Sequence, residues 1–198
     1  MDESAECWSV LMTSSPEDRF LACFSETELW EGWHQYSDNP HDPGGATYSG
    51  VTQRAYDGFR LKKGLPRQGV HAMTDAECQE IYHDEYWNAV QGDSLWAGID
   101  LCQYDESVNS GPVEATLLLQ RALGTVAVDG SLGLETLNAV LSCTDRAELI
   151  RSVCAARLSF WHKLKTWAYF GVGWNRRDVG IQAKALAMLK GDSSGPAA

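Results

Sequence analysis

Paired signals for helix starts and helix ends recur along this chain, and they restrict it to a mostly helical fold. Ser15 stands directly before Pro16, a combination typical of a helix N-terminus. The run TDAE at residues 74–77 is a capping box, and Pro112 and Gly124 bracket a segment with four leucines. Helices are therefore predicted at residues 16–31, 53–63, 75–91, 112–123, 134–141, 145–167 and 179–190.

The segment DPGGATYSGVT, at residues 42–52, has the composition of two short strands and their turns. Its Asp-Pro and Gly-Gly pairs favour turns, whereas Thr47, Tyr48 and Val51 favour extended backbone. The predicted fold class is α+β and predominantly α-helical, with one small β-hairpin.

Composition excludes several classes of protein. The 198 residues fit one domain or two small ones, and the net charge of −11 argues against a nucleic-acid binder. The sequence has no apolar run of about 18 residues, and its acidic N-terminus lacks the features of a secretory signal. Six cysteines without a CxxC motif indicate reduced thiols in a protein made in the cytoplasm. Five histidines without paired ligand spacing predict no metal site.

Basic residues gather near the C-terminus, where residues 146–190 hold nine basic and two acidic side chains. A helix there would carry Arg151, Arg157, Lys163 and Lys165 on a cationic face among apolar and aromatic residues. This face either is solvated and balances the acidic remainder, or contacts an anionic wall or a membrane during release.

Glu31 is the first candidate for chemistry. It ends the first predicted helix beside Trp30 and Trp33. The C-terminal end of a helix dipole and neighbouring aromatic rings both favour a protonated carboxylic acid. Such an acid is what a glycosidase needs to protonate the leaving oxygen. The alternative is a helix-end glutamate in solvent.

Asp42 and Thr47 follow Glu31 on the predicted hairpin. A second carboxylate can stabilise an oxocarbenium-like centre, act as a nucleophile or position water, and a threonine hydroxyl can hold that water. The alternative for Asp42 is the Asp-Pro turn itself, which its side chain favours.

The run ELWEGWHQYSDNPHDPGGATYSGVTQRAY, at residues 28–56, resembles the signature of glycoside hydrolase family 108. That signature is a helix ending in EGG, a DPGG-A/T segment and a GIT-Q segment. Family members are bacterial and phage N-acetylmuramidases, so the resemblance implies a lysozyme-like fold with Glu31 as the catalytic acid. The order Glu, Asp, Thr also resembles phage-type lysozymes, which implies a catalytic triad of Glu31, Asp42 and Thr47. Trp33 stands where the family usually has glycine.

Two further runs extend the resemblance. The segment from Leu119 to Val140 resembles the LQ…DG..G..T..A pattern of peptidoglycan-binding modules, and FGVGWNRRD at residues 170–178 resembles the muramidase closing motif. The alternative for the first run is a helical connection without a ligand. These resemblances, with a pause in periodicity near residues 92–98, imply a division of the chain. We expect a lysozyme-like catalytic region at 15–95, a helical peptidoglycan-binding region packed against it at 96–190, and a disordered tail at 191–198.

The residues near these motifs complete the expected site. The residues expected to bind substrate are Trp33, Tyr48, Gln53, Tyr104 and Asn109. The expected partner is the glycan strand of peptidoglycan, cleaved at the β-1,4 bond between N-acetylmuramic acid and N-acetylglucosamine, by a monomer without a cofactor. We expect cytoplasmic synthesis, then release to the cell wall by a holin or with transient membrane contact. The alternatives are a lytic transglycosylase and a non-catalytic protein that binds the wall or assists secretion.

Overall fold

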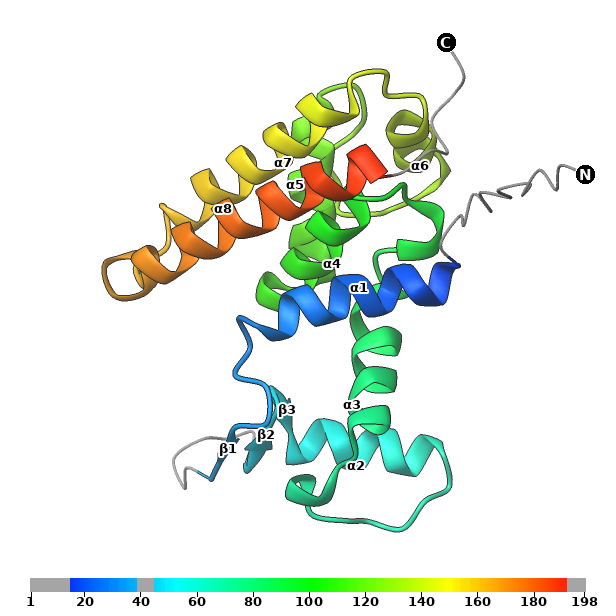
Figure 1. The fold of residues 1–198 in the computed structure, drawn as a ribbon, viewed down its shortest axis with the longest axis vertical. Helices are drawn as coiled ribbons and strands as arrows, with labels where there is room; N and C mark the ends of the chain where they lie inside the picture. The colour runs from blue at the N-terminus through cyan, green and yellow to red at the C-terminus, as the bar shows by residue number, and fades with distance from the viewer. Residues whose placement is uncertain (1–14, 39–44, 192–198) are drawn as a thin grey trace, which may run out of the picture.

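Helix α4 (Ile99–Ser110) lies at the centre of the computed structural model, which describes residues 15–38 and 45–191. It contacts four other helices, which surround it in Figure 1. These are α1 (Pro16–Glu28), α5 (Pro112–Leu123), α7 (Arg146–Trp161) and α8 (Trp167–Gly191). Helices α7 and α8 run side by side, and the short helix α6 (Leu134–Leu141) lies next to α5.

A small sheet and helix α2 (Gln53–Lys62) lie at the opposite end from α7 and α8 (Figure 1). The strands β1 (Tyr36–Ser37), β2 (Thr47–Tyr48) and β3 (Val51–Thr52) are antiparallel in the order β1-β2-β3. Helix α3 (Asp75–Tyr82) joins this end to the helical body. The remaining elements are the 3₁₀ turns Val70–Ala72 and Gly92–Ser94 and the π-helical turn His83–Trp87.

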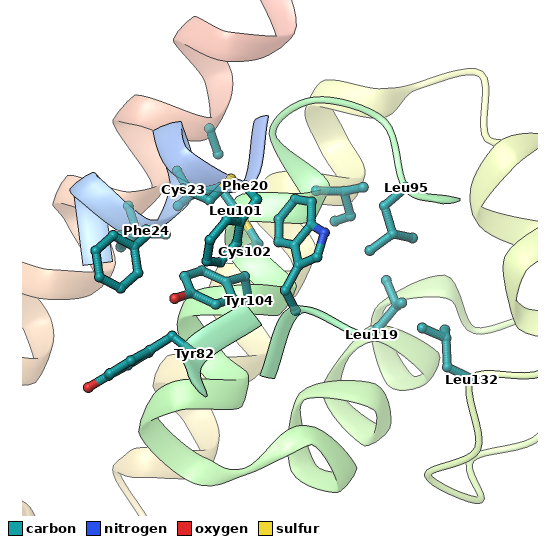
Figure 2. Packing of buried hydrophobic residues seen from close by; sticks show 14 of the residues in the cluster. Phe20, Cys23, Phe24, Tyr82, Leu95, Leu101, Cys102, Tyr104, Leu119 and Leu132 are labelled. Atoms are coloured by element: carbon teal, nitrogen blue, oxygen red, sulfur yellow. The ribbon is translucent and has the colours of Figure 1, made fainter. Parts of the chain in front are cut away.

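Aromatic rings hold α1 against α3 and α4. Phe24 contacts the ring of Tyr82 edge-on at 5.5 Å, and Phe20 contacts the ring of Tyr104 at 5.8 Å. Figure 2 shows these four side chains between the helices that carry them. Because such large rings bury much apolar surface in defined geometries, they fix the C-terminal end of α1 over α3 and α4.

Local capping signals specified several helices correctly. The side chains of Ser15 and Thr74 accept hydrogen bonds from the backbone of Asp18 and Glu77, and both helices start with complete capping boxes. The fold class is confirmed, because the structure is predominantly helical with a small antiparallel sheet. The sheet has a third strand beyond the predicted hairpin, since β1 pairs with β2.

Helix α4 was not predicted. Its residues 99–107 are all buried, including Asp100, Gln103 and Asp105. A helix buried on every side lacks the alternation of apolar and polar faces that reveals helices in a sequence.

The predicted ends of α7 and α8 were also wrong, because α7 ends at Trp161 and α8 already begins at Trp167. Gly171 lies inside α8, where a Cβ atom would come within 2.6 Å of the Trp167 ring. This glycine makes room for a ring and does not end a helix. The predicted tail begins at Gly191, which belongs to α8, and residues 192–198 lie outside the described residues.

Candidate active site

Glu31 lies in the turn that follows α1, and its side chain is 24% exposed. Its backbone N–H donates to the carbonyl of Glu28, and Gly32 (φ 66°) then turns the chain away. The carboxylate oxygen Oε1 accepts a hydrogen bond from Nη1 of Arg177 at 2.5 Å. Arg177 comes from α8, so the last helix of the fold supplies a cation to the end of the first.

Asp105 of α4 holds the other side of the Arg177 guanidinium. Nη2 of Arg177 donates to Asp105 Oδ1 at 2.9 Å, and Nε donates at 3.1 Å. Asp105 also accepts from Arg157 Nη1 at 2.8 Å, and Arg157 Nε donates to Asp178 Oδ1 at 2.8 Å. These five residues, Glu31, Arg177, Asp105, Arg157 and Asp178, form what we term the buried charge chain. Because ionised partners on both sides fix each guanidinium, the chain gives Arg177 one defined position.

Arg157 and Arg177, the two arginines of the buried charge chain, both stay cationic. Burial acts to lower the pKa of Arg177, but the charges of Asp105 and Glu31 outweigh it and raise that pKa. For Arg157, burial is likewise outweighed by Asp105 and Asp178, which raise its pKa. Arg177 therefore supplies a permanent positive charge beside Glu31.

Tyr82 and Tyr86 also belong to the surroundings of Glu31. Burial raises the pKa of both phenols, and the negative charge of Glu31 raises it further. The Tyr82 hydroxyl donates to the carbonyl of Ser49 at 3.1 Å, which ties α3 to the turn between β2 and β3. The rings of Tyr82 and Tyr86 also pack against each other, with 5.4 Å between their centroids.

Asn109 lies beside the charge chain. Its Oδ1 accepts from Nη1 of Arg177 at 3.5 Å, and its Nδ2 donates to Ser110 Oγ at 3.2 Å. The structure thus brings Asn109 to the cation that holds Glu31. Its role as a sugar ligand stays a prediction.

Thr47, Tyr48 and Trp33 lie on or near the sheet and are half-buried. Thr47 pairs with Ser37 across the β1–β2 ladder, and its hydroxyl donates to the carbonyl of Gly45 at 3.5 Å. Within residues 15–38 and 45–191, no hydrogen bond joins Thr47 to Glu31. Asp42 lies outside the described residues. The proposed triad therefore stays a prediction.

Two predicted substrate ligands have other roles. Tyr104 is fully buried and packs against Phe20 and Trp87, so its expected place in a cleft is wrong. The Gln53 amide is occupied inside the protein. Its Nε2 donates to Asp57 and to the carbonyl of Gln68, and its Oε1 accepts from the N–H of Val70. Gln53 thus holds the 68–70 loop, and its role as a sugar ligand stays a prediction.

The predicted cationic face of the C-terminal region also needs correction. Arg151, Lys163 and Lys165 are exposed, but Arg157 is 1% exposed and lies inside the charge chain. Arg177 was not among the site residues predicted from the sequence. The signal available in the sequence was the pair of arginines in the 170–178 run, together with the carboxylates of the segment that forms α4.

A groove opens between α2 and residues 81–86, a segment that spans the end of α3 and the π-helical turn and carries Tyr82 and Tyr86. It has a volume of about 390 Å³, and Arg54, Lys62 and Glu85 line it together with the tyrosines. Residues 15–38 and 45–191 contain no cluster of three or more side chains suited to a metal ion. Nor does that part of the chain contain a helix long and apolar enough to cross a membrane.

Two family models match the chain in succession. The model described as glycosyl hydrolase 108 matches residues 24–111, and the model described as predicted peptidoglycan domain matches residues 114–179. Among solved structures, Brucella abortus SagA is similar, with 35% sequence identity and a TM-score of 0.73. The match covers 90% of this chain and 99% of that one. No curated protein sequence matches significantly.

Proposed function

The chain belongs to the glycosyl hydrolase 108 family, and on this premise we propose that it is an N-acetylmuramidase with Glu31 as its general acid. The family resemblance seen in the sequence is confirmed, and its two matched regions make the chain a peptidoglycan hydrolase with peptidoglycan as its binding partner. The proposal adds the bond that is cleaved, between N-acetylmuramic acid and N-acetylglucosamine, and the residue that protonates it.

The observation that carries this proposal is the one-sided hydrogen bonding of Glu31. Oε1 accepts from Arg177, and the described part of the chain offers Oε2 no partner. Oε2 can therefore carry the proton toward a glycosidic oxygen. When the proton leaves, Arg177 stabilises the carboxylate that remains, which lowers the barrier to proton transfer.

The opposite face of the sugar needs a second group. We propose that Asp42 and Thr47 position water or stabilise positive charge there, as the order Glu, Asp, Thr implies. Thr47 lies on the middle strand of the sheet, which gives its backbone a fixed position. No metal or cofactor enters this scheme, because a carboxylic acid and a positioned water suffice for glycoside hydrolysis.

A turbidity assay on purified peptidoglycan tests the assignment of Glu31. Glu31→Gln keeps the shape of the side chain and its hydrogen-bond acceptor but cannot donate a carboxylic proton, so clearing should stop. Glu28→Gln is the matched control, since Glu28 also lies at the end of α1 but outside the charge chain. A Glu31→Gln protein that clears the wall at the wild-type rate contradicts the proposal.

Two other functions use parts of the same site. A lytic transglycosylase also works with one glutamate but leaves a 1,6-anhydro sugar end. A wall-binding or secretion-assisting protein would bind peptidoglycan and release no fragments, and Trp33 in the place of the family's glycine keeps that alternative open. The proposal also includes release through a holin and a monomeric state. It further includes a boundary at residues 95/96 between the catalytic region and the peptidoglycan-binding region.

A further inference from the structure

The groove between α2 and the 81–86 segment has an apolar floor. Val51, Phe59 and Ile81 line its base and are buried. Its volume of about 390 Å³ lies within the range of small-molecule binding sites, which are concave and apolar with a few polar groups. These proportions suit a ligand that combines an apolar surface with a charged group.

Gly58 of α2 keeps the groove open. A Cβ atom placed on Gly58 would meet no other atom within 4 Å, so the helix presents free space there. Since glycine inside a helix costs about 1 kcal/mol relative to alanine, helix stability does not explain this residue. A larger side chain at position 58 would enter the groove without a clash against the protein.

The charges along the groove do not cancel. Lys62 forms an ion pair with Glu85 at 3.3 Å. Arg54 is exposed, and no ion pair or hydrogen bond of its side chain occurs within residues 15–38 and 45–191. The groove therefore carries one unpaired positive charge in a chain whose net charge is −11. Such a local cation selects an anionic ligand.

The groove adjoins α1, the helix that leads to Glu31. Tyr82 and Tyr86 line the groove, and the Tyr82 ring packs edge-on against Phe24 of α1, with 5.5 Å between the ring centroids. A glycan whose scissile bond lies at Glu31 would therefore bring the substituents of the neighbouring sugar to the groove. In peptidoglycan, the muramic acid bears a lactyl-linked stem peptide with free carboxylates.

We propose that this groove binds the stem peptide next to the scissile bond, with Arg54 pairing with a peptide carboxylate and Tyr86 packing against the peptide. This inference rests on the proposed function, because it takes peptidoglycan as the ligand at Glu31. It adds a specificity: the enzyme distinguishes glycan that carries peptides from glycan that does not.

Calorimetric binding to non-cleaving protein tests this specificity. The Glu31→Gln variant is titrated with N-acetylglucosaminyl-N-acetylmuramoyl-tetrapeptide and with the same disaccharide lacking the peptide. Arg54→Gln in that background should raise the Kd of the peptide-bearing ligand about tenfold, as expected for a lost partly exposed charge pair. The Kd of the bare disaccharide should not change. Arg151→Gln is the matched control, because it removes one exposed arginine far along the chain on α7.

A second variant tests the open space of the groove at Gly58 rather than the charge of Arg54. Gly58→Gln fills the groove from a helical position and should also weaken binding of the peptide-bearing ligand at least tenfold, with the melting temperature recorded to show folding. The inference is overturned if Arg54→Gln leaves both Kd values unchanged, or raises both equally. Failure of the proposed function is separate, because it shows as wall clearing by Glu31→Gln itself.

Discussion

Nη1 of Arg177 donates a hydrogen bond to Oε1 of Glu31 at 2.5 Å, although 146 residues separate them. Glu31 lies in the region matched by the hydrolase model, and Arg177 lies in the region matched by the peptidoglycan model. The C-terminal region therefore supplies a cation to Glu31. A truncated protein that ends before α8 would lack this cation.

Arg177→Gln should lower turnover on peptidoglycan by at least tenfold, because the carboxylate left after proton transfer loses its cation. Arg177→Lys should recover part of the loss, since lysine keeps the charge but not the two-sided hydrogen bonding. Arg176→Gln is the control, because Arg176 is exposed on the same helix. Initial rates of wall clearing measure the effect. Equal rates for Arg177→Gln and Arg176→Gln would remove Arg177 from the mechanism.

Asp105→Asn should destabilise the fold strongly. Asp105 is completely buried and accepts from both Arg157 and Arg177, so the variant removes the carboxylate that these two buried cations share. Breaking a buried ion pair in this way costs about 3–5 kcal/mol. Urea unfolding measures the loss. The control is Glu114→Gln, which removes a surface ion pair with Arg121 and should cost under about 1 kcal/mol. Similar losses of stability in the two variants would refute the structural role of the buried charge chain.

Glu106 gives the fold a pH dependence of definite sign. Burial raises its pKa to about 7 from a usual value of 4.5, although Arg157 acts to lower it. The folded state holds this proton where the unfolded chain releases it, so stability falls as the pH rises from about 4.5 to 7 and stays reduced above 7. A shift of this size corresponds to about 3 kcal/mol.

Glu106→Gln should remove that contribution. Urea unfolding of both proteins at pH 5 and pH 8 checks the sign. Wild type should lose more stability than the variant between these two values. An identical loss in both proteins would assign the pH dependence to other groups.

Tyr104→Phe tests the corrected role of that residue. The Tyr104 hydroxyl is buried and has no hydrogen-bond partner in the described part of the chain. Its removal should raise stability by about 1 kcal/mol, since an unpaired buried hydroxyl carries a desolvation cost. Activity on peptidoglycan should stay at the wild-type level. A rise in KM without a change in stability would return Tyr104 to the substrate cleft.

The parts of the fold that the sequence predicted are those specified by near neighbours. Ser15 and Thr74 cap their helices through residues three positions away, so their role is visible in a short window. Helix α4 escaped prediction because it is buried all round. Its position depends on helices from both halves of the chain, which no local pattern contains.

The site residues that the sequence predicted also differ from those it did not in how near their partners lie along the chain. Glu31 was found from its place at a helix end and within a family signature. Arg177 was missed, because its partners Asp105 and Glu31 lie 72 and 146 residues away. Tyr104 was misplaced for the complementary reason. It is near Asp105 in sequence, but its ring points into the core between Phe20 and Trp87.

Mass spectrometry of the products released from purified peptidoglycan tests the central claim most directly. Wild-type protein should release fragments that end in a hydrated, reducing N-acetylmuramic acid, and Glu31→Gln should release none. Fragments that end in 1,6-anhydro-muramic acid, or the same hydrated fragments from Glu31→Gln, would contradict the account of Glu31 as the general acid of a muramidase.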